Sequence, residues 1–266
     1  MTGARVALVT GGARGIGAAI AVALSEQGCS VAVVDRCADD PALAYSLATP
    51  AELEAVADAC GAADDRAIGI IADVRDQSAV DAAVIATTKH FGGLDIAVAA
   101  AGAIAGGDPA WATSEEVWTT MFDINVHGVW RLARAAVPAM LRRPVPRHGR
   151  FVVVSSMGGA VGLPMLSAYV AAKHAANGLV RSMAAELGRE GITVNAIAPG
   201  STTTDMLAAS AKVYGLTDFS GLIGLHLLER PLHPDEVAAV AAFICQPESS
   251  GVTGAVLPVD AGATSQ

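Results

Sequence analysis

The sequence predicts a single α/β domain in which helices cover both faces of a parallel sheet. Short apolar runs of strand length alternate with longer amphipathic segments along all 266 residues, the order expected of repeated βαβ units. Apolar residues make up 53% of the chain but aromatic residues only 4%, so Ala, Val, Leu and Ile supply most of the hydrophobicity. Such a composition suits helices with small side chains packed on buried parallel strands.

The alternation places each element in turn. Strands are expected at residues 6–9, 30–35, 67–72, 94–99, 150–155, 193–198 and 255–259. Helices are expected at residues 15–27, 50–60, 77–91, 114–141, 167–189 and 234–245. The second helix has the clearest start, because Thr49 can cap it, Pro50 suits its first position and Glu52 can bond back to the cap. No repeat or linker divides the chain, so residues 1–266 are expected to form one domain.

Two stretches are longer than ordinary connections. Residues 36–49 join a strand to a helix, a step that usually takes about two to six residues. We predict an insertion over the adenosine site, and a neutral surface loop is the alternative. Residues 201–233 carry many apolar side chains, among them Met206, Tyr214 and Leu225. We predict that they form a substrate-binding lid, with packing at a subunit interface as the alternative.

Charge and cysteine content limit the partners. The formal net charge is −9, with 17 Lys and Arg against 26 Asp and Glu, which argues against nucleic-acid or anionic-membrane binding. The four cysteines form no CxxC pair, so we expect reduced thiols and no metal site. No stretch has the length of a membrane span or the pattern of a signal peptide. A cytoplasmic protein with no membrane partner is therefore expected.

A glycine turn, TGGARGIG, follows the first predicted strand and opens the first helix. Gly11, Gly15 and Gly17 allow the backbone to turn tightly and to approach a pyrophosphate, which the N–H groups of the helix start can bind. A tight strand-to-helix connection without a ligand is the alternative. Asp35 ends the second strand, where its carboxylate can bind the ribose hydroxyls of NAD and would repel the extra phosphate of NADP. Arg14 and Arg36 argue for NADP, but the position of Asp35 favours NAD.

Two more strand ends lie at the edge where open α/β sheets bind ligands. Asp73 and Val74 follow the third strand, and the sequence AAAG, residues 99–102, ends the fourth. Asp73 could instead be a loop carboxylate that caps the next helix.

A tyrosine and a lysine mark the chemical end of the site. Tyr169 and Lys173 stand four residues apart and so share one face of a helix. A phenol is a poor base at neutral pH, but a nearby ammonium favours the phenolate and is expected to lower the pKa of Tyr169. Packing of the aromatic ring on its helix, beside an exposed lysine, is the alternative.

Two polar residues complete the candidate set. Ser156 ends the fifth strand, where its hydroxyl could hold a carbonyl or alcohol oxygen, although serine at a strand end is often only a turn former. Asn125 lies in the middle of a predicted helix, an unfavourable place for Asn unless its amide has a specific partner. It could equally be a residue of the helix surface.

Together these motifs resemble the short-chain dehydrogenases/reductases over nearly the whole chain. The matching elements are TGxxxGxG at residues 10–17, Asp35, Asp73-Val74, Asn125, Ser156, Tyr169-x-x-x-Lys173 and PGSTTTDM at residues 199–206. The resemblance implies a single-domain Rossmann fold, a doubly wound sheet of seven parallel strands, and hydride transfer between an alcohol carbon and nicotinamide. It also implies a homotetramer.

The resemblance also implies a role for each matching residue. Tyr169 would exchange the proton, Lys173 would lower its pKa and hold the nicotinamide ribose, and Ser156 would orient the substrate oxygen. Asn125 would support a water relay. The residues expected to bind the cofactor are Gly11, Arg14, Gly15, Ile16, Gly17, Asp35, Arg36, Asp73, Val74, Ala101, Gly102, Tyr169, Lys173, Pro199, Gly200, Thr202 and Thr204.

One departure concerns the fourth strand. The family usually has Asn-Asn-Ala-Gly there, and this chain has Ala99-Ala100-Ala101-Gly102. Backbone contacts to the adenosine are expected to survive, whereas the side-chain amide that normally ties neighbouring strands together is missing.

The long connection resembles a narrower group. With its YSLATPAEL end, residues 45–53, it is similar to the short-chain dehydrogenases associated with mycofactocin, a peptide-derived redox carrier. That resemblance implies an NAD that stays bound and is reoxidised in place. The leading hypothesis is therefore an NAD-dependent dehydrogenase of a small apolar alcohol or its carbonyl.

Two rivals stay open. One is an ordinary NAD(P)(H)-exchanging reductase of ketones or 3-oxoacyl thioesters. The other is a nucleotide-sensing protein on the same fold, against which the intact Tyr169, Lys173 and Ser156 argue.

Overall fold

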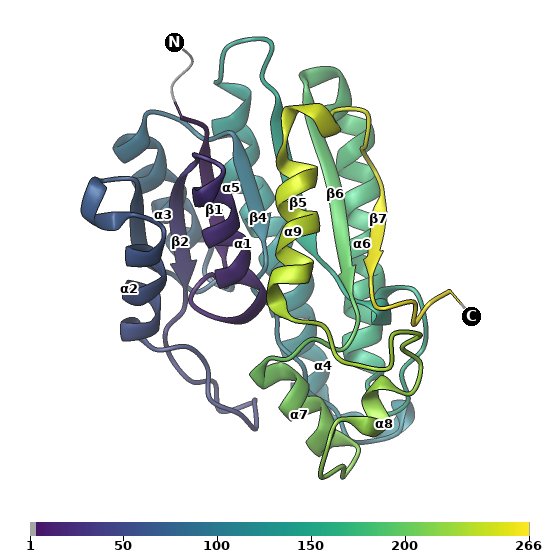
Figure 1. The fold of residues 1–266 in the computed structure, drawn as a ribbon. Coiled ribbons are helices and arrows are strands. Elements are labelled where there is room, and N and C mark those ends of the chain that lie inside the picture. Colours follow the sequence, from purple (N-terminus) through teal and green to yellow (C-terminus); the bar gives the residue numbers. More distant parts are fainter. Residues whose placement is uncertain (1–3, 266) are drawn as a thin grey trace.

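All strands of the sheet run parallel in the order β3-β2-β1-β4-β5-β6-β7, in a computed structural model that describes residues 4–265 (Figure 1). The strands are β1 Val6–Thr10, β2 Ser30–Asp35, β3 Ala67–Ile71, β4 Ile96–Ala99, β5 Gly149–Val154, β6 Ile192–Pro199 and β7 Val256–Val259. The order reverses between β1 and β4, so the carboxyl ends of these two strands flank a crevice of the kind that binds ligands. The predicted doubly wound sheet is confirmed.

Helices cover both faces of this sheet. They are α1 Gly15–Glu26, α2 Pro50–Ala59, α3 Gln77–Phe91, α4 Glu115–Phe122, α5 Gly128–Leu141, α6 Ser167–Leu187, α7 Asp205–Val213, α8 Ser220–Ile223 and α9 Pro234–Cys245. In Figure 1, α1, α2 and α9 lie on one face and α3, α5 and α6 on the other. Thr49 and Glu52 form the predicted capping box at the start of α2.

Alternating strand residues divide the core between the two faces. Val6 and Leu8 of β1 pack in the cluster shared with α3, α5 and α6, whereas Ala7 and Val9 pack in the cluster shared with α1, α2 and α9. Because side chains alternate along a strand, a sheet covered on both faces needs apolar residues at every position. This explains the continuous apolar runs in the sequence.

Two predictions about helices are incomplete. The predicted helix at 114–141 is α4 and α5 joined through a π-helical turn, Asp123–His127. The predicted lid, residues 201–233, contains two short helices, α7 and α8, for which the sequence analysis predicts no helix. Neither short helix has a side-chain cap. Burial of Leu207 and Ala211 holds α7 in place, which is a tertiary effect that local sequence signals do not report.

A buried carboxylate fixes the amino-terminal edge of the sheet. Asp95 Oδ2 accepts a 2.9 Å hydrogen bond from the Val6 backbone N–H, and Arg143 Nε lies 2.7 Å from Asp95 Oδ1. Asp95 thereby joins the start of β1 to the chain that follows α5.

Replacing Asp95 with Ala should therefore lower the free energy of unfolding by about 3 kcal/mol, because Val6 N–H and Arg143 would lose their shared partner. Urea denaturation measures this change. Glu190→Gln is the matched control, since Glu190 pairs with Arg147 in an exposed position and should change the free energy by less than about 0.5 kcal/mol. Equal effects of the two substitutions would contradict the structural role of Asp95.

Candidate active site

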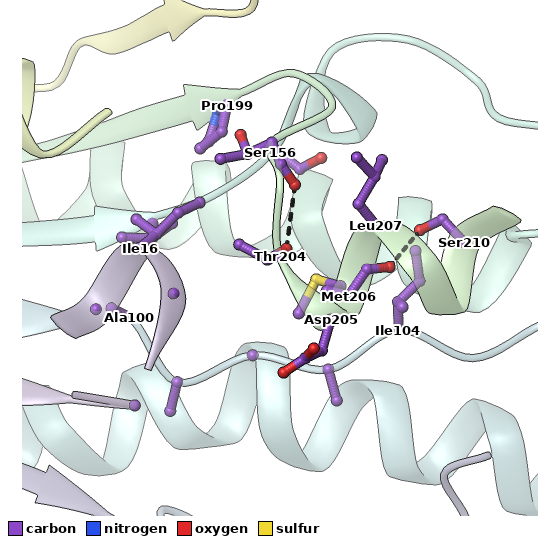
Figure 2. A pocket seen from close by; sticks show the side chains of 18 of the residues that line it. Ile16, Ala100, Ile104, Ser156, Pro199, Thr204, Asp205, Met206, Leu207 and Ser210 are labelled. Atoms are coloured by element: carbon purple, nitrogen blue, oxygen red, sulfur yellow. Dashed lines mark hydrogen bonds between the residues drawn. The ribbon is translucent and has the colours of Figure 1, made fainter. Parts of the chain in front are cut away.

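A cavity of about 1180 Å³ opens at the carboxyl ends of the strands. Its volume exceeds the roughly 300–1,000 Å³ of ordinary small-molecule pockets, so it can hold a dinucleotide together with a substrate. Figure 2 shows Ile16 and Ala100 at one end of this cavity and Ile104, Met206 and Leu207 at the other. The first end belongs to the glycine turn, and the second is apolar.

The glycine turn leaves no room for side chains. A Cβ on Gly17 would lie 2.0 Å from the Gly11 carbonyl oxygen, and a Cβ on Gly11 would lie 2.5 Å from Ala101 Cα. Gly15 has a positive φ of 57°, and Arg14, the N-cap of α1, makes no side-chain bond to the first turn. The start of α1 is therefore a backbone cradle that fits the pyrophosphate of a dinucleotide.

Asp35 stands where a ribose-binding carboxylate is expected. It ends β2 and lines the cavity, and its two oxygens accept hydrogen bonds from Ala13 N–H at 3.2 Å and Cys37 N–H at 3.3 Å. Asp73 and Val74 line the same end of the cavity. Asp73 does not cap α3, because Asp76 does so through Ser78 N–H.

Three arginines line the cavity among the residues that the structure describes, and each has a carboxylate partner. Arg14 Nη1 lies 2.8 Å from Asp205 Oδ2, and its Nη2 donates to the Ser46 carbonyl at 2.6 Å. Arg36 and Arg75 both pair with Asp40 and Asp73. The sequence left open whether Arg14 and Arg36 bind a 2′-phosphate; the structure places both in ion pairs.

The Thr10 side chain contacts the end of β4 near the alanines that replace the family's asparagines. Thr10 Oγ1 donates to the Val98 carbonyl at 3.3 Å and lies 3.5 Å from Ala101 N. The Thr10 hydroxyl thus connects β1 with β4 where the family's asparagine amide is absent. Ala101 and Gly102 line the cavity.

The cavity wall also contains the predicted chemical residues Tyr169, Lys173 and Ser156. Tyr169 and Lys173 are buried on α6, and Lys173 Nζ lies 5.7 Å from the centre of the Tyr169 ring. The ammonium donates to the Val154 carbonyl at 3.0 Å. Ser156 follows β5 and accepts a 3.1 Å bond from Gly158 N–H, so it is a turn former as well as a residue of the cavity wall.

The protein environment shifts both titrating groups of this cluster. Burial raises the pKa of Tyr169 to about 12, and a hydrogen bond with Ser156 offsets only part of that shift. This is opposite to the lowered pKa that we predict from the neighbouring ammonium. Burial also lowers the pKa of Lys173 to about 8. Burial therefore favours the neutral form of both groups.

Asn125 is a buried residue with specific partners. The π-helical turn turns its side chain toward the segment after β4, where Nδ2 donates to the Ala103 carbonyl at 3.0 Å and Oδ1 accepts from Ala103 N–H at 3.3 Å. Nδ2 also lies 2.9 Å from the Met121 carbonyl. A Cβ on Gly102 would lie 3.1 Å from Asn125 Oδ1 and 3.5 Å from Lys173 Nζ. Asn125 and Lys173 thus converge on one point of the chain.

The segment after β6 forms the remaining wall. Pro199, Gly200, Thr202 and Thr204 all line the cavity, and Thr204 Oγ1 bonds to the Thr202 carbonyl at 3.2 Å. The sequence did not indicate His226, which is buried and accepts from Ser201 N–H at 3.2 Å while its Nδ1 bonds to the Arg230 carbonyl. His226 fixes the path of the chain into α7.

The apolar end of the cavity is built from segments distant in sequence. Its lining includes Ile104, Leu163, Leu166, Met206, Leu207, Tyr214, Leu216 and Leu222. The Tyr214 hydroxyl donates to the Pro164 carbonyl at 2.8 Å, which joins the chain after α7 to the loop before α6.

The described part of the chain contains no cluster of three potential metal ligands, and none of its helices is long and apolar enough to cross a membrane.

Known proteins share this sequence pattern. The profile of the enoyl-(acyl carrier protein) reductase family matches residues 11–264. An uncharacterised NAD-dependent oxidoreductase of Mycobacterium tuberculosis is 35% identical over 266 residues, with 97% of this chain and 95% of that protein covered. The (−)-trans-carveol dehydrogenase of Rhodococcus erythropolis is 34% identical over 279 residues, with 98% and 97% covered.

Two solved structures with a similar fold are complexes with a nicotinamide cofactor. The NAD complex of carveol dehydrogenase from Mycobacterium avium has a TM-score of 0.93 and 35% identity, covering 100% of this chain and 99% of that one. The NADH complex of 3-ketoacyl-(acyl-carrier-protein) reductase from Brucella melitensis has a TM-score of 0.86 and 29% identity, with 98% and 99% covered. The chain therefore belongs to the short-chain dehydrogenases/reductases. It is an NAD-dependent oxidoreductase, as predicted.

The buried Lys173 charge should make the protein less stable at neutral pH. Its pKa of about 8 is below the ordinary value of 10.5, and at pH 7 both the folded and the unfolded chain hold the proton, so the full penalty applies. Above pH 8 the folded chain loses the proton first and the penalty fades. Lys173→Met should therefore raise the free energy of unfolding by about 2 kcal/mol at pH 7, and by progressively less as the pH approaches 10.5.

Refolding from urea, after bound nucleotide has been dialysed away, measures this gain. The exposed Lys212 supplies the control Lys212→Met, which should leave the free energy of unfolding nearly unchanged. A Lys173→Met protein that is less stable than the wild type at pH 7 would contradict the prediction.

Proposed function

We propose that this protein oxidises a small apolar alcohol with an NAD that stays bound between turnovers and is reoxidised in place by mycofactocin. The observation that carries the proposal is the single cavity that joins the glycine cradle to Ser156, Tyr169 and an apolar wall, with the 36–49 insertion bonded across it. The reverse reaction, reduction of the matching ketone or aldehyde, uses the same groups.

Each polar residue of the cluster has a proposed task. Ser156 Oγ holds the substrate oxygen, and Tyr169 Oη takes the hydroxyl proton. Lys173 holds the nicotinamide ribose and supplies positive charge beneath the phenol. NAD, held by the glycine cradle and Asp35, would supply the hydride acceptor and would add positive charge to the cavity in its oxidised form. That added charge opposes the raised pKa of the phenol, which burial alone leaves at about 12.

Asn125 is proposed as a positioning residue. Its amide is bonded to both backbone groups of Ala103, so it holds the segment after β4 against the π-helical turn. The same amide lies beside Lys173, which is compatible with the water relay that the family resemblance implies.

The apolar wall supports the substrate class. Met206, Leu207 and Leu166 provide hydrocarbon contacts and no charge, so a substrate with one hydroxyl on a hydrocarbon frame fits best. Two of the similar proteins bear the name carveol dehydrogenase, which agrees with such an alcohol. Residues 201–233 would close over this end as a lid, and the bond from Tyr214 to Pro164 fixes its outer edge.

The insertion supports retention of the cofactor. Leu43 is buried against Val74 and Ile104, and the Tyr45 hydroxyl accepts a 3.1 Å bond from Ile104 N–H. Arg14 holds the Ser46 carbonyl. Residues 36–49 thus extend from the adenosine end past the glycine turn to the segment after β4. Such a cover would hinder release of the nucleotide by holding its adenosine half.

A second candidate is a reductase of 3-oxoacyl thioesters with freely exchanging NADH. It is favoured by the resemblance to the 3-ketoacyl-(acyl-carrier-protein) reductase structure, which also holds NADH. Steady turnover with added NAD, from protein isolated without nucleotide, would favour this candidate.

We also propose a cytoplasmic homotetramer. Trp118 of α4 and Trp130 of α5 are both nearly half exposed, as expected of helices that pair with another subunit. The four cysteines are free, which agrees with a reducing compartment.

Tyr169→Phe should reduce alcohol oxidation by about 10³-fold or more, because the substrate hydroxyl loses its proton acceptor. The variant should still contain NAD, since the ring remains and the cradle is untouched. Oxidation of a carveol-like alcohol with an artificial electron acceptor measures the first effect, and chromatography of nucleotide released on unfolding measures the second. Near-normal activity of Tyr169→Phe would identify another group as the base.

Deleting residues 37–48 should make the cofactor exchange with the solution. The wild type should release NAD only on unfolding and should turn over many times with an artificial acceptor but not with added NAD. The shortened protein should lose NAD on gel filtration and turn over with added NAD. Shortened protein that folds and still retains its nucleotide would contradict the role of the insertion.

A further inference from the structure

We infer that Asp40, in the 36–49 insertion, makes the protein selective for NAD over NADP by holding Arg36 and Arg75 away from the adenosine ribose. Asp35 already stands at the ribose position, but two guanidinium groups line the same end of the cavity. Free arginines at this place would attract a 2′-phosphate. Selectivity for NAD over NADP therefore depends on which groups of the protein pair with Arg36 and Arg75.

One oxygen of Asp40 engages both arginines. Asp40 Oδ2 lies 2.6 Å from Arg36 Nη1 and 2.7 Å from Arg75 Nη1. These terminal nitrogens are the parts of each side chain that would reach a phosphate. Asp73 binds the remaining sides, with Arg36 Nε at 3.3 Å and Arg75 Nη2 at 2.8 Å. Asp40 thus occupies one terminal nitrogen of each arginine, and Asp73 binds Nε of Arg36 and the other terminal nitrogen of Arg75.

The insertion holds this carboxylate in place. Asp40 Oδ1 accepts a 2.9 Å bond from Ala42 N–H, and the Asp40 carbonyl accepts a 3.0 Å bond from Leu43 N–H. The Asp40 side chain is only 4% exposed, whereas that of Asp73 is 27% exposed. Burial opposes ionisation of Asp40, but the Ala42 bond and the two guanidinium groups outweigh it and keep its pKa below the usual range. Asp40 is therefore a fixed anion at neutral pH.

The formal charges at this end of the cavity also favour NAD over NADP. Asp35, Asp40 and Asp73 bring three negative charges, and Arg36 and Arg75 bring two positive ones, so this end of the cavity is net negative by one. Asp40→Asn makes the balance zero and frees two terminal nitrogens. Both changes favour a nucleotide with a 2′-phosphate.

Asp40→Asn should raise the NADP-to-NAD ratio of bound nucleotide about tenfold, as expected when one hydrogen bond to a charged group becomes available to the phosphate. The measurement depends on whether the cofactor is retained or exchanges with the solution. If NAD is retained, chromatography of nucleotide released on unfolding gives the ratio. If it exchanges, calorimetric titration with NADP and NAD gives the ratio of Kd values. The result is thus independent of whether the proposed retention is correct.

Asp39→Asn is the matched control. Asp39 is the neighbouring acid of the same insertion, but it accepts from Leu47 N–H at 2.7 Å and pairs with neither arginine. Its substitution removes the same charge and should leave the ratio as in the wild type. An equal shift in both variants, or no shift in folded Asp40→Asn, would overturn the inference.

Adding Arg36→Gln or Arg75→Gln to Asp40→Asn identifies the freed cation. At least one of these double variants should return the ratio toward the wild-type value, and persistence of the full gain in both would also overturn the inference. The double variants also serve if Asp40→Asn does not fold, because each removes the carboxylate with one of its cations. The double variant that keeps the freed arginine should then still exceed the wild-type ratio, and a wild-type ratio in both would overturn the inference.

Discussion

The close approach of the glycine turn to the end of β4 is the contact on which the rest of the site depends. The backbone of Gly11 lies against that of Ala101, and Gly17 lies directly over the Gly11 carbonyl. No side chain fits at either place. Beside this contact, the start of α1, the carboxylate of Asp35 and the segment that Asn125 holds all face one cavity. The parallel sheet then adds Ser156 and the wall after β6 from the same edge.

Two kinds of electrostatic environment share this cavity. At the adenosine end, Asp40 and Asp73 pair closely with Arg36 and Arg75, and Asp35 accepts bonds from backbone N–H groups. At the chemical end, Tyr169 and Lys173 are buried with few polar neighbours, and both shift toward their neutral forms. In the first environment, ion pairs fix the charged side chains. In the second, the buried Lys173 ammonium is unfavourable, so the pKa values of Tyr169 and Lys173 are sensitive to any charge that binds beside them.

The sequence predicted the sheet, most helices and the chemical residues, because each depends on local pattern or on a short motif. The capping box at Thr49 and the Tyr169–Lys173 spacing are of this kind. It did not predict α7 and α8, the π-helical turn at Asn125, or the direction of the Tyr169 pKa shift. These depend on burial by distant segments. Likewise, only the folded chain brings Asp40 to Arg75 and Arg14 to Asp205.

Arg14 binds the insertion through the main-chain carbonyl of Ser46 and not through its side chain. A carbonyl is present whatever residue occupies position 46, so substitutions along the insertion preserve this bond provided that the backbone keeps its path. A change in the number of residues would displace the carbonyl. Related proteins are therefore expected to differ in the residue at position 46 but to keep the same number of residues in this loop.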